Sequence, residues 1–345
     1  MTYSVSLPRF LSRLLPVGWL LLGLLLAGCA NLQNSGSWAE PSAVTLAQEP
    51  LLTRPWSFGP MPGTLIQTDH YRVYTTIKDP LFQRMLSKVL EAGYSHHLSM
   101  NPQAQVPGPM VCYVFADRPQ WEAHTQMRNP ANWEVYKAIS QGGYCQEGVF
   151  AGYDIGRRNT LSVIAHEGWH QFSWYAFKDR LPSWLEEGLA TQYEALEWDG
   201  VTPRFVPAQN YARWKALQAA WRGNRLWKVR DLTSTHAGRV IKKEPEAVDA
   251  YYAQLWAMVL FLEHSAYKPK LEALLEEARQ GKMTRHLVGT NVTPDQISRF
   301  SEKWNETAGP LYMRVYLNQN MDQLEKEYLR FIQQLVNSWP PKLNP

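Results

Sequence analysis

The chain has 345 residues, 45% of them hydrophobic and 12% aromatic, so it can bury a large core in one domain or two lobes and is neither disordered nor fibrous. Its formal charge of +4 at pH 7 is small, and no block of lysine and arginine of the kind that follows phosphates occurs along it. We therefore expect no nucleic acid partner. Its 15 tryptophans are assigned to core and groove packing in preference to a sugar-stacking surface.

Residues 1–28 are predicted to be a signal sequence and are set aside from the fold. After a positively charged start, the apolar run from Leu14 to Leu26 is shorter than a transmembrane helix needs. The run closes with Leu26-Ala27-Gly28-Cys29, which resembles the lipobox of bacterial lipoproteins. The resemblance implies that Cys29 carries lipid and anchors the protein, and Ala30 implies the periplasmic face of the outer membrane. The alternatives are an uncleaved anchor and an ordinary secretory signal.

Residues 29–60 are rich in Ser, Pro, Gln and Ala and lack periodicity, which is typical of a flexible tether, so we expect folded structure from about Gly63. Residues 61–156 then read as a small sheet with helices on it. Strands are predicted at 70–77, 110–116 and 148–155, and helices at 81–94 and 120–127. Cys112 and Cys145 lie in this lobe, and in a compartment that permits disulfides they form either a bridge or two buried free thiols.

Residues 157–345 show an almost wholly helical pattern. Helices are predicted at 159–175, 182–196, 208–221, 245–264, 268–280, 294–304 and 321–336. The predicted fold class is therefore α+β, a small mixed sheet lobe followed by a mostly helical lobe. The functional site is expected at the junction of the two lobes, because the chemistry-bearing segment begins the helical lobe.

That segment is His166-Glu167-Gly168-Trp169-His170. Residues four apart share one face of a helix, so His166 and His170 can bind a single metal ion together. Glu167 then projects beside the ion, where a carboxylate can take a proton from a water held there. The spacing and residue types predict one Zn²⁺ per chain and hydrolytic chemistry.

A catalytic zinc site uses three protein ligands and keeps one position for water, and Glu186, Glu187 and Glu194 are the candidates for the third ligand. The segment from Trp184 to Ala190, WLEEGLA, resembles the WLxEGxA segment of gluzincins, the metallopeptidases that include thermolysin and the zinc aminopeptidases. The resemblance covers residues 148–262. It implies a zincin-like fold with Glu187 as the third zinc ligand.

The neighbours of Glu187 have expected roles of their own. Glu186 should point to solvent. The small Gly188 and Ala190 should let their helix approach the helix of His166 closely. Glu194, two helical turns after Glu187, either orients a ligand histidine from outside the coordination shell or is an ordinary surface carboxylate.

The gluzincin resemblance further implies a group that stabilises an oxyanion. Tyr252 begins a segment similar to the YxKGxxxLxxL pattern of zinc aminopeptidases, with Gln254 and Leu255 in place of the basic residue and the glycine. Tyr251 and His236 are the alternatives. The resemblance also makes strand 148–155 the sheet edge that pairs with an extended peptide, where Phe150 and Gly152 share one face.

The sequence thus predicts a lipid-anchored zinc hydrolase of the bacterial envelope that acts on peptides or proteins, with Glu167 as the general base. The glycine-rich acidic segment by which zinc aminopeptidases capture a free amino terminus is absent, which favours an endopeptidase or a narrow specificity. One rival is a non-catalytic zinc-binding envelope protein, although structural zinc sites are closed and usually rich in thiolates. Another is a zinc hydrolase of a non-peptide amide or ester.

Overall fold

The computed structural model describes residues 50–139, 142–293, 296, 302–341 and 343. The predicted signal sequence, Cys29 and most of the predicted tether lie outside these residues, as does most of the helix predicted at 294–304. No helix among the described residues has the length and apolar character needed to span a membrane.

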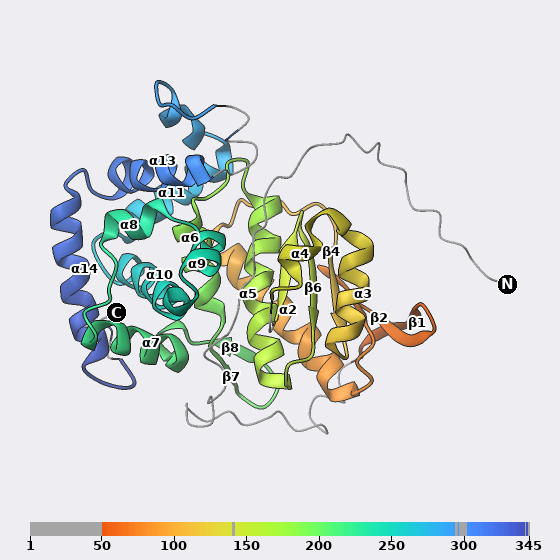
Figure 1. Ribbon diagram of the computed structural model, residues 1–345. Helices are drawn as coiled ribbons and strands as arrows, with labels where there is room; N and C mark the ends of the chain where they lie inside the picture. The colour runs from red at the N-terminus through yellow and green to blue at the C-terminus, as the bar shows by residue number, and fades with distance from the viewer. Residues whose placement is uncertain (1–49, 140–141, 294–295, 297–301, 342, 344–345) are drawn as a thin grey trace.

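A six-stranded mixed sheet forms the amino-terminal lobe, with the strand order β1-β2-β3-β4-β6-β5 (Figure 1). Strands β3, β4 and β6 run parallel to one another, while β5 pairs antiparallel with β6 at the edge. The strands are β1 (Leu52–Phe58), β2 (Met61–Gln67), β3 (Tyr71–Thr75), β4 (Met110–Phe115), β5 (Gly143–Gln146) and β6 (Val149–Tyr153).

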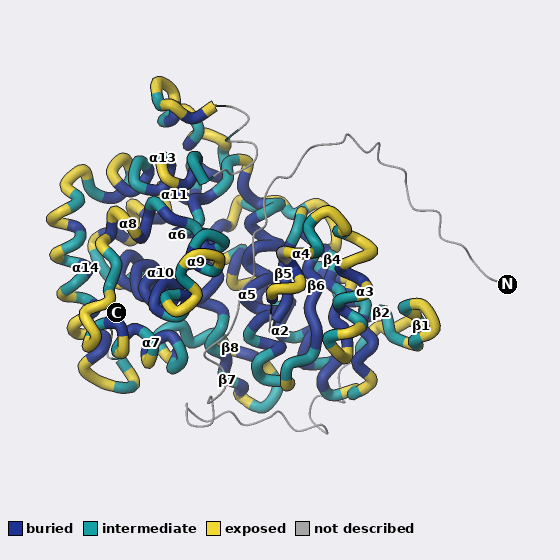
Figure 2. Tube along the Cα trace, viewed as in Figure 1, coloured by how far each residue is buried: buried dark blue, intermediate teal, exposed yellow. Residues whose placement is uncertain are grey.

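At the other edge of the sheet, the folded structure begins earlier in the chain than predicted. Folded structure was expected from about Gly63, with a tether through residue 60, but β1 begins at Leu52 and pairs with β2 along its whole length. Five of the seven residues of β1 are exposed, so the strand lacks the alternation of apolar and polar residues that reveals a half-buried strand. Figure 2 shows this hairpin as an exposed projection of the sheet.

The prediction that strand 148–155 is the sheet edge is wrong. Strand β6 lies between β4 and β5, so neither of its sides is free, and the edge strand is β5. With only four residues, β5 is too short for the period of two that predicts a strand. Phe150 and Gly152 are buried within the sheet, and Phe150 is 1% exposed.

Helices cover both faces of the sheet, as the alternation along β4 requires. The Sγ of Cys112 donates a hydrogen bond to the side chain of Gln171 on one face. The ring of Tyr113 packs 4.5 Å from that of His124 on the other. The first face carries α2 (Pro80–Met100) and α5 (Arg157–Ala176), and the second carries α3 (Arg118–Arg128) and the short α4 (Trp133–Tyr136).

The helical lobe is organised around α10 (Val248–Glu263), in which all but two of the 16 residues are buried. Packed on it or beyond it are α6 (Ser183–Ala190), α7 (Tyr211–Arg222), α8 (Val229–Ser234), α9 (Ala237–Lys243), α11 (Lys268–Gln280), α13 (Glu302–Tyr312) and α14 (Met321–Val336), together with the small hairpin of β7 (Leu196–Trp198) and β8 (Pro203–Phe205). Helices α11 and α14 coincide with the predicted ranges. The chain is mixed α and β as predicted, and α5 lies between the sheet and the helical lobe (Figure 1).

Candidate metal centre

Helix α5 carries the two histidines and is buried on several sides, because the sheet and the helical lobe both pack against it. It begins after Gly156, whose φ of +92° favours glycine at the turn out of β6. The side-chain amide of Gln171 donates hydrogen bonds to the backbone carbonyls of Val111 at 2.8 Å and Gly148 at 3.0 Å. These bonds fix the helix on the sheet and hold its opposite face toward α6.

His166, His170 and Glu187 bring together three buried atoms that could bind one metal ion, called the ligand triangle below. The two Nε2 atoms of the histidines are 3.3 Å apart. The Oε2 of Glu187 is 3.4 Å from the Nε2 of His166 and 3.7 Å from that of His170. In a tetrahedral zinc site with bonds of about 2.0–2.1 Å, ligand atoms lie about 3.3–3.4 Å apart. The donor set and its spacing therefore fit one zinc ion.

Helix α6 positions Glu187, but it does so against a different neighbour from the one predicted. A Cβ on Gly188 would lie 2.8 Å from Cγ2 of Val259 and 3.0 Å from the carbonyl oxygen of Leu255, both on α10. The small residue thus permits close approach of α6 to α10, whereas the sequence prediction paired it with the helix of His166. A sequence pattern shows that a helix approaches something closely without showing which helix it approaches.

Each candidate ligand histidine has a carboxylate on the side of its ring away from Glu187. The Nδ1 of His166 lies 3.0 Å from Oε1 of Glu194, and the Nδ1 of His170 lies 3.0 Å from Oε1 of Glu186. Carboxylates in this position fix the ring orientation and leave Nε2 free for a metal. Glu194 follows the 3-10 turn η3 (Thr191–Tyr193) that continues α6.

The prediction that Glu186 points to solvent is wrong. The residue is 5% exposed, and its Oε1 accepts hydrogen bonds from the hydroxyl of Ser173 as well as facing His170. These partners satisfy the carboxylate inside the protein, which removes the usual reason for a glutamate to stay at the surface. The sequence held one signal for this role: if His170 binds a metal, its second ring nitrogen needs a carboxylate partner, and Glu186 is a nearby candidate.

The electrostatics of the site favour a cation. Burial lowers the pKa of His166, but Glu187 and Glu194 outweigh it and raise that pKa to about 9. Burial raises the pKa of Glu187, yet the neighbouring His170 and His166 bring it down to about 2. Buried negative charge of this kind needs a positive partner. Burial likewise lowers the pKa of His170, but Glu187 and Glu186 outweigh it and raise that pKa well above the usual value. Two protonated imidazoles can therefore supply the positive charge, and a divalent ion at the triangle can supply it instead.

Glu167 is the remaining carboxylate of the centre and is 1% exposed. Burial raises its pKa, and the neighbouring His170 and His166, followed by the backbone N–H of Cys145 in β5, oppose that rise. Its Oε2 has no hydrogen-bond partner among the described residues. The carboxylate thus lies beside the edge strand, and its Oε2 stays available for another group.

Tyr252, on α10, lies beside the ligand triangle. Its ring centre is 6.4 Å from that of His166, and its buried hydroxyl has no hydrogen-bond partner within the described part of the chain. Burial, followed by the charge of Glu187, raises its pKa well above the usual value, so the hydroxyl keeps its proton. The alternative Tyr251 packs against Trp227 and Tyr252.

The other sequence candidates have structural surroundings of their own. His236 caps the amino terminus of α9, where its Nδ1 accepts a hydrogen bond from the backbone of Arg239 at 3.3 Å. Cys112 and Cys145 are buried free thiols, which is one of the two states that the sequence allowed.

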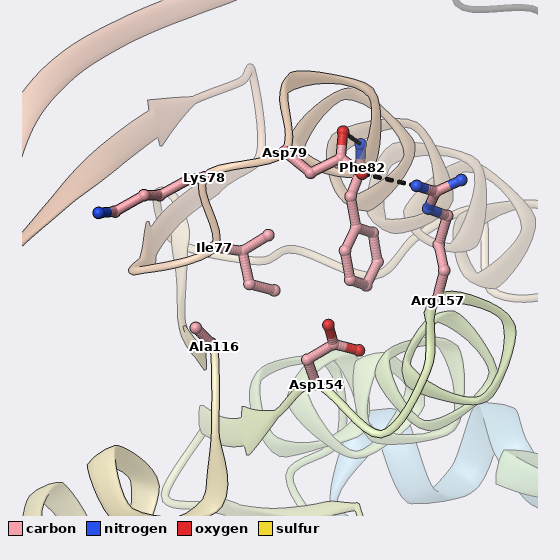
Figure 3. A pocket seen from close by; sticks show the side chains of 7 residues that line it. All are labelled: Ile77, Lys78, Asp79, Phe82, Ala116, Asp154 and Arg157. Atoms are coloured by element: carbon pink, nitrogen blue, oxygen red, sulfur yellow. Dashed lines mark hydrogen bonds and ion pairs between the residues drawn. The ribbon is translucent and has the colours of Figure 1, made fainter.

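A pocket of about 430 Å³ lies apart from the ligand triangle, at the carboxyl ends of β3, β4 and β6 (Figure 3). Three of its four charged residues have local partners: Arg157 pairs with Asp79 at 2.6 Å, and Asp154 accepts hydrogen bonds from Gly156 and Thr160. Its lining includes none of the candidate ligands: Ile77, Lys78, Asp79, Phe82, Ala116, Asp154 and Arg157.

A family model of unknown function matches the segment of the chain that carries the candidate site. Residues 160–283 match the family model described as "Protein of unknown function (DUF1570)". The match spans roughly a third of the chain, from the first turn of α5 to the end of α11, and so contains the ligand triangle, Glu167, Glu186, Glu194 and Tyr252. No curated protein and no solved structure matches the chain.

Proposed function

We propose that the protein is a zinc-dependent hydrolase with a zincin-like fold, and that it cleaves peptide bonds as gluzincins do. The observation that carries the proposal is the triangle of His166, His170 and Glu187, whose edges of 3.3, 3.4 and 3.7 Å suit tetrahedral zinc. Three protein ligands leave a fourth position open, which is the arrangement of catalytic rather than structural zinc.

Glu167 is the general base in this proposal. Bound zinc supplies a Lewis acid, which lowers the pKa of water and polarises a substrate carbonyl. The free Oε2 of Glu167 accepts the proton of the attacking water and passes it to the leaving amine. Burial raises the pKa of this carboxyl, which brings its proton affinity closer to what a base working near neutral pH needs.

Tyr252 supplies the proposed oxyanion donor. Its hydroxyl is buried, protonated and unpartnered among the described residues, so it can donate a hydrogen bond to the carbonyl oxygen as negative charge develops there. The ring already lies next to His166, and no rearrangement of α10 is needed to bring the two together.

Strand β5 replaces β6 as the proposed binding edge for an extended peptide. It is the outer strand of the sheet, and the backbone of its Cys145 lies beside Glu167. A peptide pairing along β5 would therefore run past the general base. Phe150 and Gly152 of β6 lie beneath this edge and support it without contacting substrate.

The proposed location is the bacterial envelope, with the chain anchored through lipid on Cys29 at the periplasmic face of the outer membrane. The lipobox-like closing residues carry this part of the proposal. Radiolabelled palmitate should enter the wild-type chain and not a Cys29→Ser variant, and equal labelling of the two would remove the lipid anchor from the account.

Hydrolysis is tested with the full-length chain purified in detergent and a diverse peptide library read by mass spectrometry. We expect cleavage that a zinc chelator stops, and no cleavage by Glu167→Gln, which should still hold one zinc. Glu197→Gln, a carboxylate paired with Arg204 on the surface, is the control and should cleave normally. Unchanged turnover by Glu167→Gln would refute the role of the base. Bound zinc without any cleavage would favour a binding protein or a hydrolase of another amide or ester.

A further inference from the structure

Behind Glu194 lies an arginine that sequence reasoning did not single out. Arg213 is in the first turn of α7 and is 4% exposed. Its Nε donates to Oε2 of Glu194 at 2.8 Å, and its Nη2 donates to Oε1 at 2.7 Å. Asn210, which caps α7, adds a third hydrogen bond to Oε2 at 2.8 Å. The carboxylate that supports His166 is therefore itself held by a two-pronged clamp.

Arg213 also contacts the other side of the centre. Its guanidinium carbon lies 5.0 Å from the ring centre of Tyr252, within the range of a cation–π interaction. One side chain thus contacts both the carboxylate behind a proposed zinc ligand and the ring of the proposed oxyanion donor. Strong packing of α7 on α10 holds the backbone that carries these groups.

We propose that Arg213 is a positioning residue of the metal centre, which fixes the orientation of His166 through Glu194 and the ring of Tyr252 through stacking. This inference rests on the proposed zinc site. An arginine suits the role because its rigid planar fork binds both carboxylate oxygens at once, whereas a lysine offers a single point charge. Arg213 touches no substrate in this account and acts only through the two residues that it holds.

The first test measures zinc affinity, which a purely structural ion pair would leave unchanged. Full-length wild type, Arg213→Met and Arg213→Lys are compared by competition with a chromophoric chelator. Loss of a residue that orients a ligand typically weakens metal binding about 10–100-fold, so we expect about tenfold for Arg213→Met and a smaller loss for Arg213→Lys. Arg204→Met, which breaks an exposed pair with Glu197, is the matched control and should bind zinc as the wild type does.

A double-mutant cycle tests the route of the effect. If Arg213 acts through Glu194, the double variant Arg213→Met/Glu194→Gln should lose much less zinc affinity than the product of the two single fold-losses. Independent, multiplying effects would overturn the proposed route. Zinc affinity within twofold of wild type in a folded Arg213→Met protein would overturn the proposal as a whole. If Arg213→Met does not fold, unchanged affinity in Arg213→Lys has the same meaning.

These outcomes separate this inference from the proposed function. A wild type that binds zinc and cleaves no peptide contradicts the peptidase and leaves the affinity comparison decisive for Arg213. A wild type that binds no zinc overturns both. Where a substrate is cleaved, we also expect Arg213→Met to lower kcat while KM stays close to wild type, because Tyr252 acts on the transition state.

Discussion

The two candidate ligand histidines lie one helical turn apart, yet different parts of the molecule support them. Behind His166 stand Glu194, Asn210 and Arg213, which follow α6 or belong to the start of α7. Behind His170 stands Glu186, held by the hydroxyl of Ser173 from the same helix as the histidine. The first support therefore depends on the tertiary packing of the helical lobe, and the second is made by α5 and α6 alone.

Removing the first support should have the largest effect. Glu194→Ala leaves the buried charge of Arg213 without its partner, and breaking a buried pair in this way costs about 3–5 kcal/mol of unfolding free energy. Zinc affinity should fall as well, by about 10–100-fold. Denaturant unfolding and chelator competition measure the two effects. A stability loss below about 1 kcal/mol would show that Arg213 does not depend on this carboxylate.

Removing Glu186, the support behind His170, should lower the unfolding free energy by less, while lowering zinc affinity by a similar factor. Glu186→Ala leaves the Nδ1 of His170 without its carboxylate partner, whereas the hydroxyl of Ser173 can still donate to the backbone carbonyl of His170. A buried polar group left unsatisfied in this way costs about 1–3 kcal/mol. We again expect zinc affinity to fall about 10–100-fold. If Glu186→Ala destabilises the protein more than Glu194→Ala does, the contrast between a tertiary and a local support is wrong.

A substitution at Gly188 should disturb the contact of α6 with α10 while leaving every candidate ligand residue in place. In Gly188→Ala the new methyl group would meet Val259 and the Leu255 carbonyl, and overpacking of this kind costs about 1–3 kcal/mol. The displaced α6 should weaken zinc binding through both Glu187 and Glu186. Ala190→Gly on the same helix is the control, and it should lower stability by only about 1 kcal/mol through helix propensity. Equal zinc affinity in wild type and Gly188→Ala would show that α6 tolerates the shift.

A buried histidine far from the ligands should make the sheet lobe sensitive to acid. Burial, and then the charge of Arg128, lowers the pKa of His124 to about 4. The unfolded chain therefore binds a proton near pH 6.5 that the folded chain binds only near pH 4, so stability falls as the pH drops between these values. Between pH 6.5 and pH 5 this amounts to about 1–2 kcal/mol. In His124→Phe that part of the pH dependence should vanish; if the stability profile keeps the same slope, another group is responsible.

Features of the site that depend on neighbouring residues in the chain could be predicted from the sequence, and features that depend on tertiary packing could not. His166 and His170 share a helix, and the segment from Trp184 to Ala190 sits on the next, so periodicity and a motif were enough to bring the three candidate ligands together. The roles of Glu186 and Gly188 depend on which helix α6 packs against, and a one-dimensional pattern does not contain that information. The four-residue β5 is likewise defined by its pairing with β6 and by no pattern of its own.

The role of Arg213 could not be predicted from the sequence either, because it depends on tertiary contacts. It lies 19 residues after Glu194, outside any motif, and an arginine at the start of a helix usually faces solvent. Only the packing of α7 on α10 turns it inward. The pattern holds across the centre: atoms that would touch the metal were predictable, while the groups that hold them depend on the assembled fold.

The most direct test of the account is the zinc content of the purified full-length chain and of its His166→Ala variant, measured by elemental analysis after dialysis against metal-free buffer. The account predicts one zinc per wild-type chain, because the three candidate ligand atoms lie 3.3, 3.4 and 3.7 Å from one another, close to tetrahedral spacing. It predicts close to none in a folded His166→Ala chain. A full equivalent of zinc in the variant, or none in the wild type, would contradict it.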